Sequence, residues 1–283
     1  MNILGINAYH PDSSACVVIN GSLVAAVEEE RFTRIKHWAG FPAKAINYCL
    51  NEAKLSAGDL DYIAVNRDPK ANFLKKVLYT VTRRPRLMMV RDRLQNIRLI
   101  NNIKHTYADL FLLDVKKLKT KIINVEHHHA HLASAFYVCD YRDAAVVTID
   151  GFGDFTSCMV AKGSDKDLTI KYQIHYPHSL GLFYTALTQF LGFKRFGDEY
   201  KVMGLAAFGK PRYMKEMEKI LILKPNGTFC LNLEYFVFQN QLHLMQWENS
   251  EPLLEDVFSQ AMPALLGPTR SYEEEISSFH CDI

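Results

Sequence analysis

The sequence lacks the features that would place the protein in a membrane or on a polyanion. No stretch reaches the roughly 18 consecutive apolar residues of a membrane-spanning helix. The N-terminus, MNILGINAYHPD, has no basic segment of the kind that opens a secretory signal peptide. The formal net charge of +2 is too small to indicate a general polyanion-binding protein. We therefore expect a soluble cytoplasmic protein without a membrane partner.

The six cysteines also fail to form a recognisable pattern. The sequence contains no CxxC pair, and the cysteines are too sparse for a disulfide scaffold, so we expect free thiols. What is present is an ordinary globular composition: 283 residues, of which 48% are hydrophobic and 23% are charged. Such a chain is long enough for one large domain or two lobes. The cysteines lie at positions 16, 49, 139, 158, 230 and 281.

Hydrophobic periodicity predicts an α/β protein in which strands and helices alternate. Asn20-Gly21 between two apolar segments predicts a two-residue hairpin turn. Segment 68–115 is expected to be mostly helical, and a short helix is expected after Pro211. The remaining helices are expected at 41–55, 126–136 and 180–193. The strands are expected at 2–7, 14–19, 22–30, 61–67, 121–125, 144–150, 156–163, 168–174 and 227–236.

One strand-turn-strand pattern occurs twice. ILGINAYHPDSSACVVINGSLVAAVEE and VVTIDGFGDFTSCMVAKGSDKDLTIKY share an apolar strand, a turn with an Asp, a second strand that contains Ser, a turn and a third strand. Tight turns between neighbouring strands bring backbone N–H groups together, which suits phosphate oxygens. Two such lobes would leave a nucleotide cleft between them. The alternative is that two three-strand units arose in an α/β chain by chance.

The segment VEHHHAHLASAF contains four of the eleven histidines within five positions. If a helix begins here, His127 and His131 share one face, because residues four apart are about 40° apart around the axis. Two such imidazoles form half of a metal site, and Asp150 at the end of a strand is a candidate anionic ligand. This set suits iron, manganese or zinc. The alternative is a surface histidine cluster without a ligand.

Five ordered motifs then resemble the O-carbamoyltransferase family that modifies nodulation factors and antibiotics. They are NAYHPDSSACVV, EEERFTRIKHWAGFP, EHHHAHLASAF, VVTIDGFGD and GDEYKVMGLAAFGKP, which together cover about residues 2–211. The resemblance implies a duplicated actin, hexokinase and Hsp70-type (ribonuclease H-like) fold, related to enzymes that transfer threonylcarbamoyl to tRNA. It places a first lobe at 1–120 and an incomplete second lobe at 121–283.

The resemblance also implies a reaction in two stages. A YrdC-like domain would make carbamoyl-adenylate from carbamoyl phosphate and ATP, and the region seen here would transfer the carbamoyl group to a hydroxyl of a small-molecule acceptor. Family members are roughly twice as long, so the chain is expected to be truncated at its C-terminus and to lack the YrdC-like domain. We expect such a piece to be unable to perform the full reaction.

Residue by residue, the resemblance makes His127, His131 and Asp150 ligands of a metal, expected to be Fe²⁺, with a further Asp from later in the chain. His10 and Asp12 match a turn in the transfer site, where a His could orient or deprotonate the acceptor hydroxyl. A bound cation would stabilise the developing oxyanion. The alternative for His10 is a structural residue that caps the turn.

The nucleotide side of the site has weaker signals. By the resemblance, Lys36 matches a basic position near carbamoyl-adenylate. Gly151 and Gly153 in DGFGD would let the backbone approach phosphate, and Lys201 and Gly204 in YKVMGLA would serve the nucleotide. Taken alone, each of these short motifs is explained by an ordinary turn at least as well as by a nucleotide site.

Three other interpretations remain open. The stretch from Arg67 to Lys121 holds fifteen Lys or Arg against four Asp, which could face nucleic acid. A solvated helical face, or the docking surface of another domain, explains it better, so nucleic acid is not expected. An ATP-dependent sugar or acetate-type kinase of the same superfold would explain the repeat but not the histidines. A catalytically inactive metal-binding fragment would explain the length.

Overall fold

The computed structural model of the 283-residue chain describes residues 1–83, 97–239, 246–248, 251–253 and 255–283. The chain divides into two compact units. Unit 1 comprises Met1–Phe73, Arg86–Ala130 and Asn249–Glu251. Unit 2 comprises Leu74–Pro85, His131–Glu248 and Pro252–Ile283. The two lobes expected from the sequence stay a prediction.

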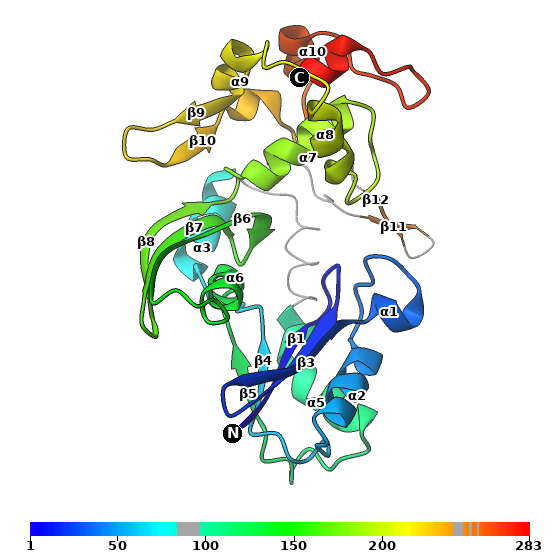
Figure 1. Ribbon diagram of the computed structural model, residues 1–283, viewed down its shortest axis with the longest axis vertical. Coiled ribbons are helices and arrows are strands. Elements are labelled where there is room, and N and C mark those ends of the chain that lie inside the picture. Colours follow the sequence, from blue (N-terminus) through cyan, green and yellow to red (C-terminus); the bar gives the residue numbers. More distant parts are fainter. Residues whose placement is uncertain (84–96, 240–245, 249–250, 254) are drawn as a thin grey trace. The chain divides into compact units, whose positions relative to one another are not determined.

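Unit 1 is built on a five-stranded sheet with the strand order β3-β2-β1-β4-β5 (Figure 1). The first three strands form an antiparallel meander, and β4 and β5 continue the sheet parallel to β1. The pairing of β5 with β4 places residues 121–124 in unit 1. The strands are β1 (Asn2–Asn7), β2 (Ser14–Ile19), β3 (Ser22–Glu28), β4 (Tyr62–Val65) and β5 (Lys121–Asn124).

Alternating side chains explain why these segments form strands. Leu4 and Ile6 are buried on one face of β1, as the period of two requires. The hairpin between β2 and β3 turns at Asn20 and Gly21, which both have positive φ, as a tight two-residue turn demands. The predicted hairpin is thus confirmed.

Helices α2 (Ala43–Glu52) and α5 (Ile103–Leu110) complete the core of unit 1. Helix α2 buries Ala45, Ile46, Cys49 and Leu50, which follow helical spacing, in one cluster with the sheet residues. The short helix α1 (Glu30–Thr33) follows β3 and ends at Arg34 in a left-handed conformation. The core therefore holds the sheet rigidly, so that the loops after its strands have fixed starting points.

Unit 2 contains a second antiparallel meander, β6-β7-β8 (Figure 1). Its strands are β6 (Asp143–Gly153), β7 (Thr156–Ser164) and β8 (Asp167–His175). Helix α6 (His127–Phe136) buries Leu132 and Phe136 with residues of β6 and β7. A Cβ at Gly163 would lie 2.4 Å from the Phe136 ring, so this strand position has room only for glycine.

A second cluster of buried residues fills the rest of unit 2 around helix α7 (Leu180–Phe190). The elements that follow are short, and Figure 1 shows them as small helices and hairpins. They are α8 (Glu199–Ala206), α9 (Met214–Ile220), β9 (Leu221–Leu223), β10 (Phe229–Leu231), η1 (Leu233–Tyr235), β11 (Gln246–Glu248), β12 (Glu251–Leu253), α10 (Ala261–Leu266) and α11 (Ser278–Asp282). Helix α3 (Phe73–Arg83) also belongs to unit 2, apart from its first residue.

The expected α/β class is confirmed, and so are the strands of both copies of the repeated pattern. That the two units are a duplication of the actin type stays a prediction, as does the C-terminal truncation. All six cysteines are free. Within the described part of the chain, no helix is both long and apolar enough to cross a membrane.

Candidate functional site

Helix α6 begins directly after Glu126, and this residue caps it. The Glu126 carboxylate accepts a hydrogen bond from the backbone N–H of His129 at 2.8 Å. A carboxylate here satisfies an N–H that has no partner within the helix and interacts favourably with the helix dipole. The His129 ring lies against the same carboxylate, with Nδ1 3.4 Å from Oε2. His129 is therefore engaged by the cap, and His128 is completely buried.

The other two histidines, His127 and His131, lie four residues apart on α6, as the sequence predicted. The boundary between the two units falls within helix α6, between Ala130 and His131. Because α6 is one continuous helix, its geometry alone determines how His127 and His131 are spaced. His127 is 9% exposed, whereas His131 is exposed. Within unit 2, His131 Nε2 lies 3.7 Å from Asp150 Oδ2.

Asp150 is held in place by its own strand and by the next helix. It lies on β6 where the pairing with β7 becomes irregular, between Ile149 and Gly153. Its Oδ1 accepts the backbone N–H of Gly151 at 2.6 Å. Its carbonyl oxygen accepts the hydroxyl of Ser179 at 2.9 Å. A bulged strand end of this kind re-aims a side chain, here toward His131.

The three side chains fit a divalent cation. One ligand atom from each of His127, His131 and Asp150 lies within 4.8 Å of the other two. Two atoms that each sit about 2.1 Å from an ion are at most about 4.2 Å apart, so small rotamer changes would bring the set to coordination distance. Two imidazoles and one carboxylate suit iron, manganese or zinc.

His10 lies in a tight turn after β1. Asn7 fixes this turn, because its side-chain amide donates to the carbonyl oxygens of Pro11 and Asp12, both at 3.0 Å. Tyr9 and Asp12 have positive φ, which costs free energy unless the surroundings hold them. Ser13 helps, since its hydroxyl donates to the His10 carbonyl oxygen at 3.0 Å. Hydrogen bonds from the Asn7 amide and the Ser13 hydroxyl therefore hold the strained turn in one conformation.

Sheet topology brings His10 and His127 together within unit 1. His10 comes three residues after the end of β1, and His127 comes three residues after the end of β5. These strands are parallel, so both residues follow the carboxyl edge of the sheet, where α/β proteins bind ligands. The centres of the two imidazole rings are 5.9 Å apart.

The loop that carries Lys36 is bound to the His10 turn. Ser13 N–H donates to the Trp38 carbonyl at 2.9 Å, and Tyr9 N–H donates to the Gly40 carbonyl at 3.1 Å. These bonds place the second motif, EEERFTRIKHWAGFP, beside the first, although 25 residues separate Asp12 from His37. Lys36 itself is exposed.

Asp12 contacts a residue that the sequence did not single out. His37 Nδ1 lies 2.9 Å from Asp12 Oδ1, and the backbone N–H of His37 donates to Glu30 at 3.0 Å. Asp12, Glu30 and His37 thus form a second group of close potential ligands. Hydrogen bonds within this group account for its arrangement. The pairing could not be read from spacing, because it depends on how two loops meet.

The glycines and lysine assigned to the nucleotide differ in their surroundings. Nothing lies within 4 Å of a Cβ built at Gly151 or Gly204, so both positions face open space. Lys201 Nζ lies 2.6 Å from Asp198 Oδ1, and this hydrogen bond raises the pKa of the lysine. Lys201 therefore stays charged and is partly engaged by its own helix end. Gly153 lies in the irregular pair of β6 with β7.

The N-terminus of α7 is a feature that sequence reasoning missed. Ser179 is the N-cap, and its hydroxyl accepts the Leu182 N–H at 3.1 Å. A Cβ at Gly181 would lie 2.5 Å from the Gly151 nitrogen and 2.6 Å from the Asp150 carbonyl carbon. The first turn of the helix therefore lies against the Asp150 backbone, and helix N-termini bind anions. Ser179 and Gly181, two residues apart at a helix start, are the signal that could have found it.

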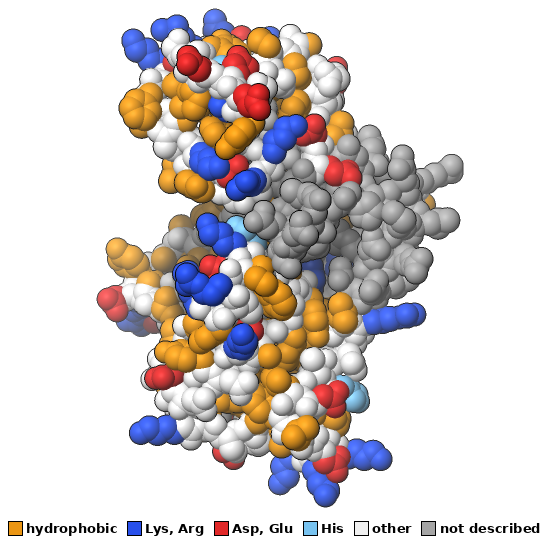
Figure 2. Space-filling model, turned by 90° about the vertical axis from the view of Figure 1, so that its right-hand side faces the viewer, with side chains coloured by type: hydrophobic (Ala, Val, Ile, Leu, Met, Phe, Trp, Pro, Cys, Tyr) orange, Lys and Arg blue, Asp and Glu red, His pale blue; other side chains and the backbone are white. Residues whose placement is uncertain are grey.

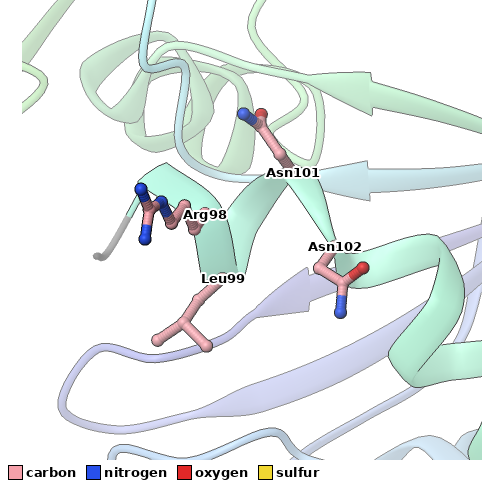
Figure 3. Close-up of a pocket in the computed structure, with 4 residues that line it drawn as sticks. All are labelled: Arg98, Leu99, Asn101 and Asn102. Atoms are coloured by element: carbon pink, nitrogen blue, oxygen red, sulfur yellow. The ribbon is translucent and has the colours of Figure 1, made fainter. Parts of the chain in front are cut away.

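Two further surface features carry no site residue. A shallow depression in unit 1 is lined by Arg98, Leu99, Asn101 and Asn102 (Figure 3), none of which belongs to the motifs. Part of the basic stretch 67–121 falls in 84–96, outside the described residues. On the face seen in Figure 2, Lys and Arg side chains occur together with Asp and Glu side chains. The expectation that nucleic acid is not a partner stays a prediction.

Two known proteins are similar in sequence to much of this chain. The uncharacterized protein sll1178 of Synechocystis is 38% identical over all of this chain and 45% of its own length. The nodulation protein NolNO of Sinorhizobium fredii is 33% identical over 81% of this chain and 32% of its own length. The chain thus spans less than half the length of each of these relatives.

Likeness to solved structures is low. YeaZ from Pseudomonas aeruginosa aligns with 62% of this chain and 67% of its own, at 14% identity and a TM-score of 0.34. No conclusion about the fold follows from a likeness of that level. The family comparison is decisive instead, because the model described as "Carbamoyltransferase N-terminus" matches residues 2–270. With nearly its whole length matched, the chain belongs to the carbamoyltransferase N-terminus family.

Proposed function

We propose that this chain holds the transfer site of a carbamoyltransferase, which passes the carbamoyl group of carbamoyl-adenylate to a hydroxyl of a small-molecule acceptor. The observation that carries the proposal is the cluster of His127, His131 and Asp150 in a chain of this family. A kinase of similar architecture would not need this cluster of two histidines and an aspartate. Carbamoyl phosphate and ATP would be the source of the donor.

A divalent cation, Fe²⁺ by the family resemblance, would be held by His127, His131 and Asp150. When bound, it would supply positive charge that stabilises the oxyanion developing on the carbamoyl carbonyl. The chain's contribution is to hold the ligands close to the arrangement that an ion needs. The Gly151 N–H and the Ser179 hydroxyl hold Asp150 on both its side chain and its carbonyl, and α6 fixes the separation of the histidines.

His10 would act on the acceptor. Its Nδ1 lies 3.3 Å from the Pro11 carbonyl oxygen, which favours the tautomer with the proton on Nδ1. In that tautomer Nε2 would accept the hydroxyl proton as the oxygen attacks the carbamoyl carbon. The contact with the His127 ring keeps this base beside the proposed metal ligand.

The nucleotide would be bound by groups with complementary charge. The N-terminus of α7 at Ser179 and Gly181 offers backbone N–H groups to the phosphate, and Lys201 and Lys36 add positive charge. Adenylate is the leaving group, and these residues would stabilise the negative charge that it carries away. Gly151, Gly153 and Gly204, which have no side chains, would leave room for the adenylate.

The test of this proposal is metal binding. The full 283-residue chain is stripped, reloaded with Fe²⁺ under anaerobic conditions and assayed by elemental analysis and equilibrium binding. Because His131 supplies a ligand and His129 is engaged by Glu126, His131→Ala should weaken metal affinity about tenfold or more. His129→Ala, on the same helix, is the matched control and should change it less than threefold. Equal losses in both variants, or a parent chain that binds no divalent metal, would contradict the site.

A further inference from the structure

Strand β6 leaves the regular ladder of its sheet where it carries the candidate metal ligand. The register of β6 with β7 passes from the pair Ile149–Cys158 directly to the pair Gly153–Thr156. Residues 150–152 therefore bulge out of the ladder. A bulged segment lacks the regular ladder bonds of a strand, so its position depends on contacts from other elements.

Aromatic side chains support one end of this bulge. The centres of the Phe152 and Tyr176 rings are 4.8 Å apart. Tyr176 is buried, its hydroxyl donates to the Phe238 carbonyl oxygen at 2.8 Å, and its backbone N–H donates to the Phe155 carbonyl oxygen at 3.1 Å. Because Tyr176 is held at both its ring and its backbone, it gives Phe152 a fixed surface to pack on.

The two-residue turn between β6 and β7 is strained and depends on the same rings. Asp154 and Phe155 both have positive φ, at 46° and 75°. A bulky residue such as Phe155 keeps this conformation where its surroundings hold it. The Phe155 ring is stacked with the His175 ring at 6.4 Å and lies 5.9 Å from the Tyr176 ring, between centres. The turn and the bulge therefore share one aromatic cluster.

Helix α3 supplies a further ring to this cluster. The Tyr79 ring contacts Phe155 and Tyr176 edge-to-face, at 5.5 and 5.4 Å between centres. One turn earlier on the helix, Lys75 Nζ contacts His175 Nε2. Neither Tyr79 nor Lys75 lies in any of the five sequence motifs. A helix outside the motifs thus packs on the turn that follows the candidate ligand.

We propose that Tyr79 is a positioning residue for the candidate metal site, because by holding Phe155 and Tyr176 it fixes the bulge that presents Asp150. The inference rests on the proposed function, since that function gives the bulge its role. Without the Tyr79 ring, the cluster loses two edge-to-face contacts and the strained turn can relax. The bulge would then sample other conformations, and the Asp150 carboxylate would spend less time beside His131.

The first measurement needs no metal. Hydrogen exchange of the full metal-free chain, followed by mass spectrometry, reports local opening of residues 150–156. Tyr79→Ala should raise the exchange rate of this segment about fivefold or more. Tyr213→Ala is the matched control, because Tyr213 is a half-buried tyrosine of unit 2 with its own edge-to-face partner, Phe279, at 5.7 Å between centres. It should change exchange in the segment less than about twofold.

The second measurement is Co²⁺ binding, since the visible absorption of this ion reports the geometry of its ligands. Tyr79→Ala should weaken Co²⁺ affinity about tenfold and change the spectrum, as loss of a supporting residue does at other metal sites. Tyr79→Phe keeps the ring and loses the hydrogen bond of its hydroxyl to the Gln239 carbonyl oxygen, at 3.1 Å. It should stay within about twofold of the parent in both measurements, and Tyr213→Ala should leave the spectrum unchanged.

Equal effects of Tyr79→Ala and Tyr213→Ala on residues 150–156 would overturn the proposal, because lost stability alone would then explain both. So would a Tyr79→Phe variant that loses as much protection as Tyr79→Ala, because the ring would not be what holds the bulge. A parent chain that binds no Co²⁺ would instead contradict the proposed function, and hydrogen exchange would still decide whether Tyr79 holds the bulge. Circular dichroism checks folding. If Tyr79→Ala is not folded, Tyr79→Leu, which removes the aromatic ring but keeps an apolar side chain, takes its place with the same expected direction.

Discussion

At the scale of single residues, His10 is the clearest candidate for proton transfer. It sits in a turn held by Asn7 and Ser13, and its ring is 5.9 Å from that of His127. Such a turn costs backbone strain at Tyr9 and Asp12, which is typical of functional sites. The structural alternative for His10 would be a cap of the turn, and its Nδ1 does lie 3.3 Å from the adjacent Pro11 carbonyl oxygen.

We predict that His10→Ala lowers the rate of transfer from preformed carbamoyl-adenylate by about 10² to 10⁴, the usual contribution of a general base. The assay uses the longest natural form of the protein and a hydroxyl acceptor, with bound metal measured in parallel. Metal content should stay within twofold of the parent, since His10 is not one of the proposed ligands. Transfer at the parental rate would return His10 to a structural role, and loss of metal would make it a ligand.

At the scale of elements, the start of α7 determines how Asp150 is presented. Gly181 is the point of closest approach, because any side chain there meets the Asp150–Gly151 backbone at about 2.5 to 2.7 Å. Backbone cannot move aside as a flexible side chain can, so the helix itself must shift. Ser179 ties the same helix to the Asp150 carbonyl, so such a shift would reach the candidate ligand directly.

We predict that Gly181→Ala lowers the free energy of unfolding by about 1–3 kcal/mol, the range for overpacking a tight site. It should also weaken adenylate binding and metal binding. Gly204→Ala is the matched control, since Gly204 lies inside α8 with nothing within 4 Å of its Cβ. That change should be neutral or raise stability by about 0.5–1 kcal/mol, because alanine favours helix over glycine. Urea unfolding and calorimetric titration with AMP measure both effects, and similar losses in the two variants would contradict the argument.

Most elements could be predicted from the sequence because their signals are local. The alternation in β1 and the Asn20-Gly21 turn need no tertiary information, and the i, i+4 spacing of His127 and His131 follows once α6 is expected. The Asp12–His37 pair and the contact of Gly181 with Asp150 could not be predicted in this way. Both depend on how segments far apart in the chain meet. The exposure of apolar residues on α3, such as Leu74 at 81% and Val81 at 67%, could not be predicted either, because periodicity shows that a helix has an apolar face but not where that face points.

At the scale of the whole molecule, the carboxyl edge of the parallel strands in unit 1 explains why the motifs are so far apart in sequence. The first motif follows β1 and the histidine motif follows β5, and between them the chain has to complete α2, β4 and α5. Residues 117 positions apart, His10 and His127, therefore meet at one edge. Within unit 2, the meander residue Asp150 places its Oδ2 3.7 Å from His131 Nε2.

The last prediction concerns the division of labour in the complete reaction. The family model described as the carbamoyltransferase N-terminus takes up residues 2–270 of the 283, and the chain matches 45% of the length of sll1178. The family resemblance assigns synthesis of carbamoyl-adenylate to a separate YrdC-like domain. We therefore expect that the 283-residue chain, given ATP and carbamoyl phosphate, releases no pyrophosphate above background.

The measurement is a coupled pyrophosphate assay, with ADP followed in the same samples. Supplying preformed carbamoyl-adenylate and an acceptor then distinguishes a chain that only lacks the first step from one that is inert. Sustained pyrophosphate release that depends on carbamoyl phosphate would mean that the adenylate is made within these residues. Formation of ADP instead would favour a kinase, because phosphoryl transfer from ATP leaves ADP whereas adenylate formation releases pyrophosphate. In that case His127, His131 and Asp150 would need another explanation, since phosphoryl transfer to a hydroxyl requires no such ligand set.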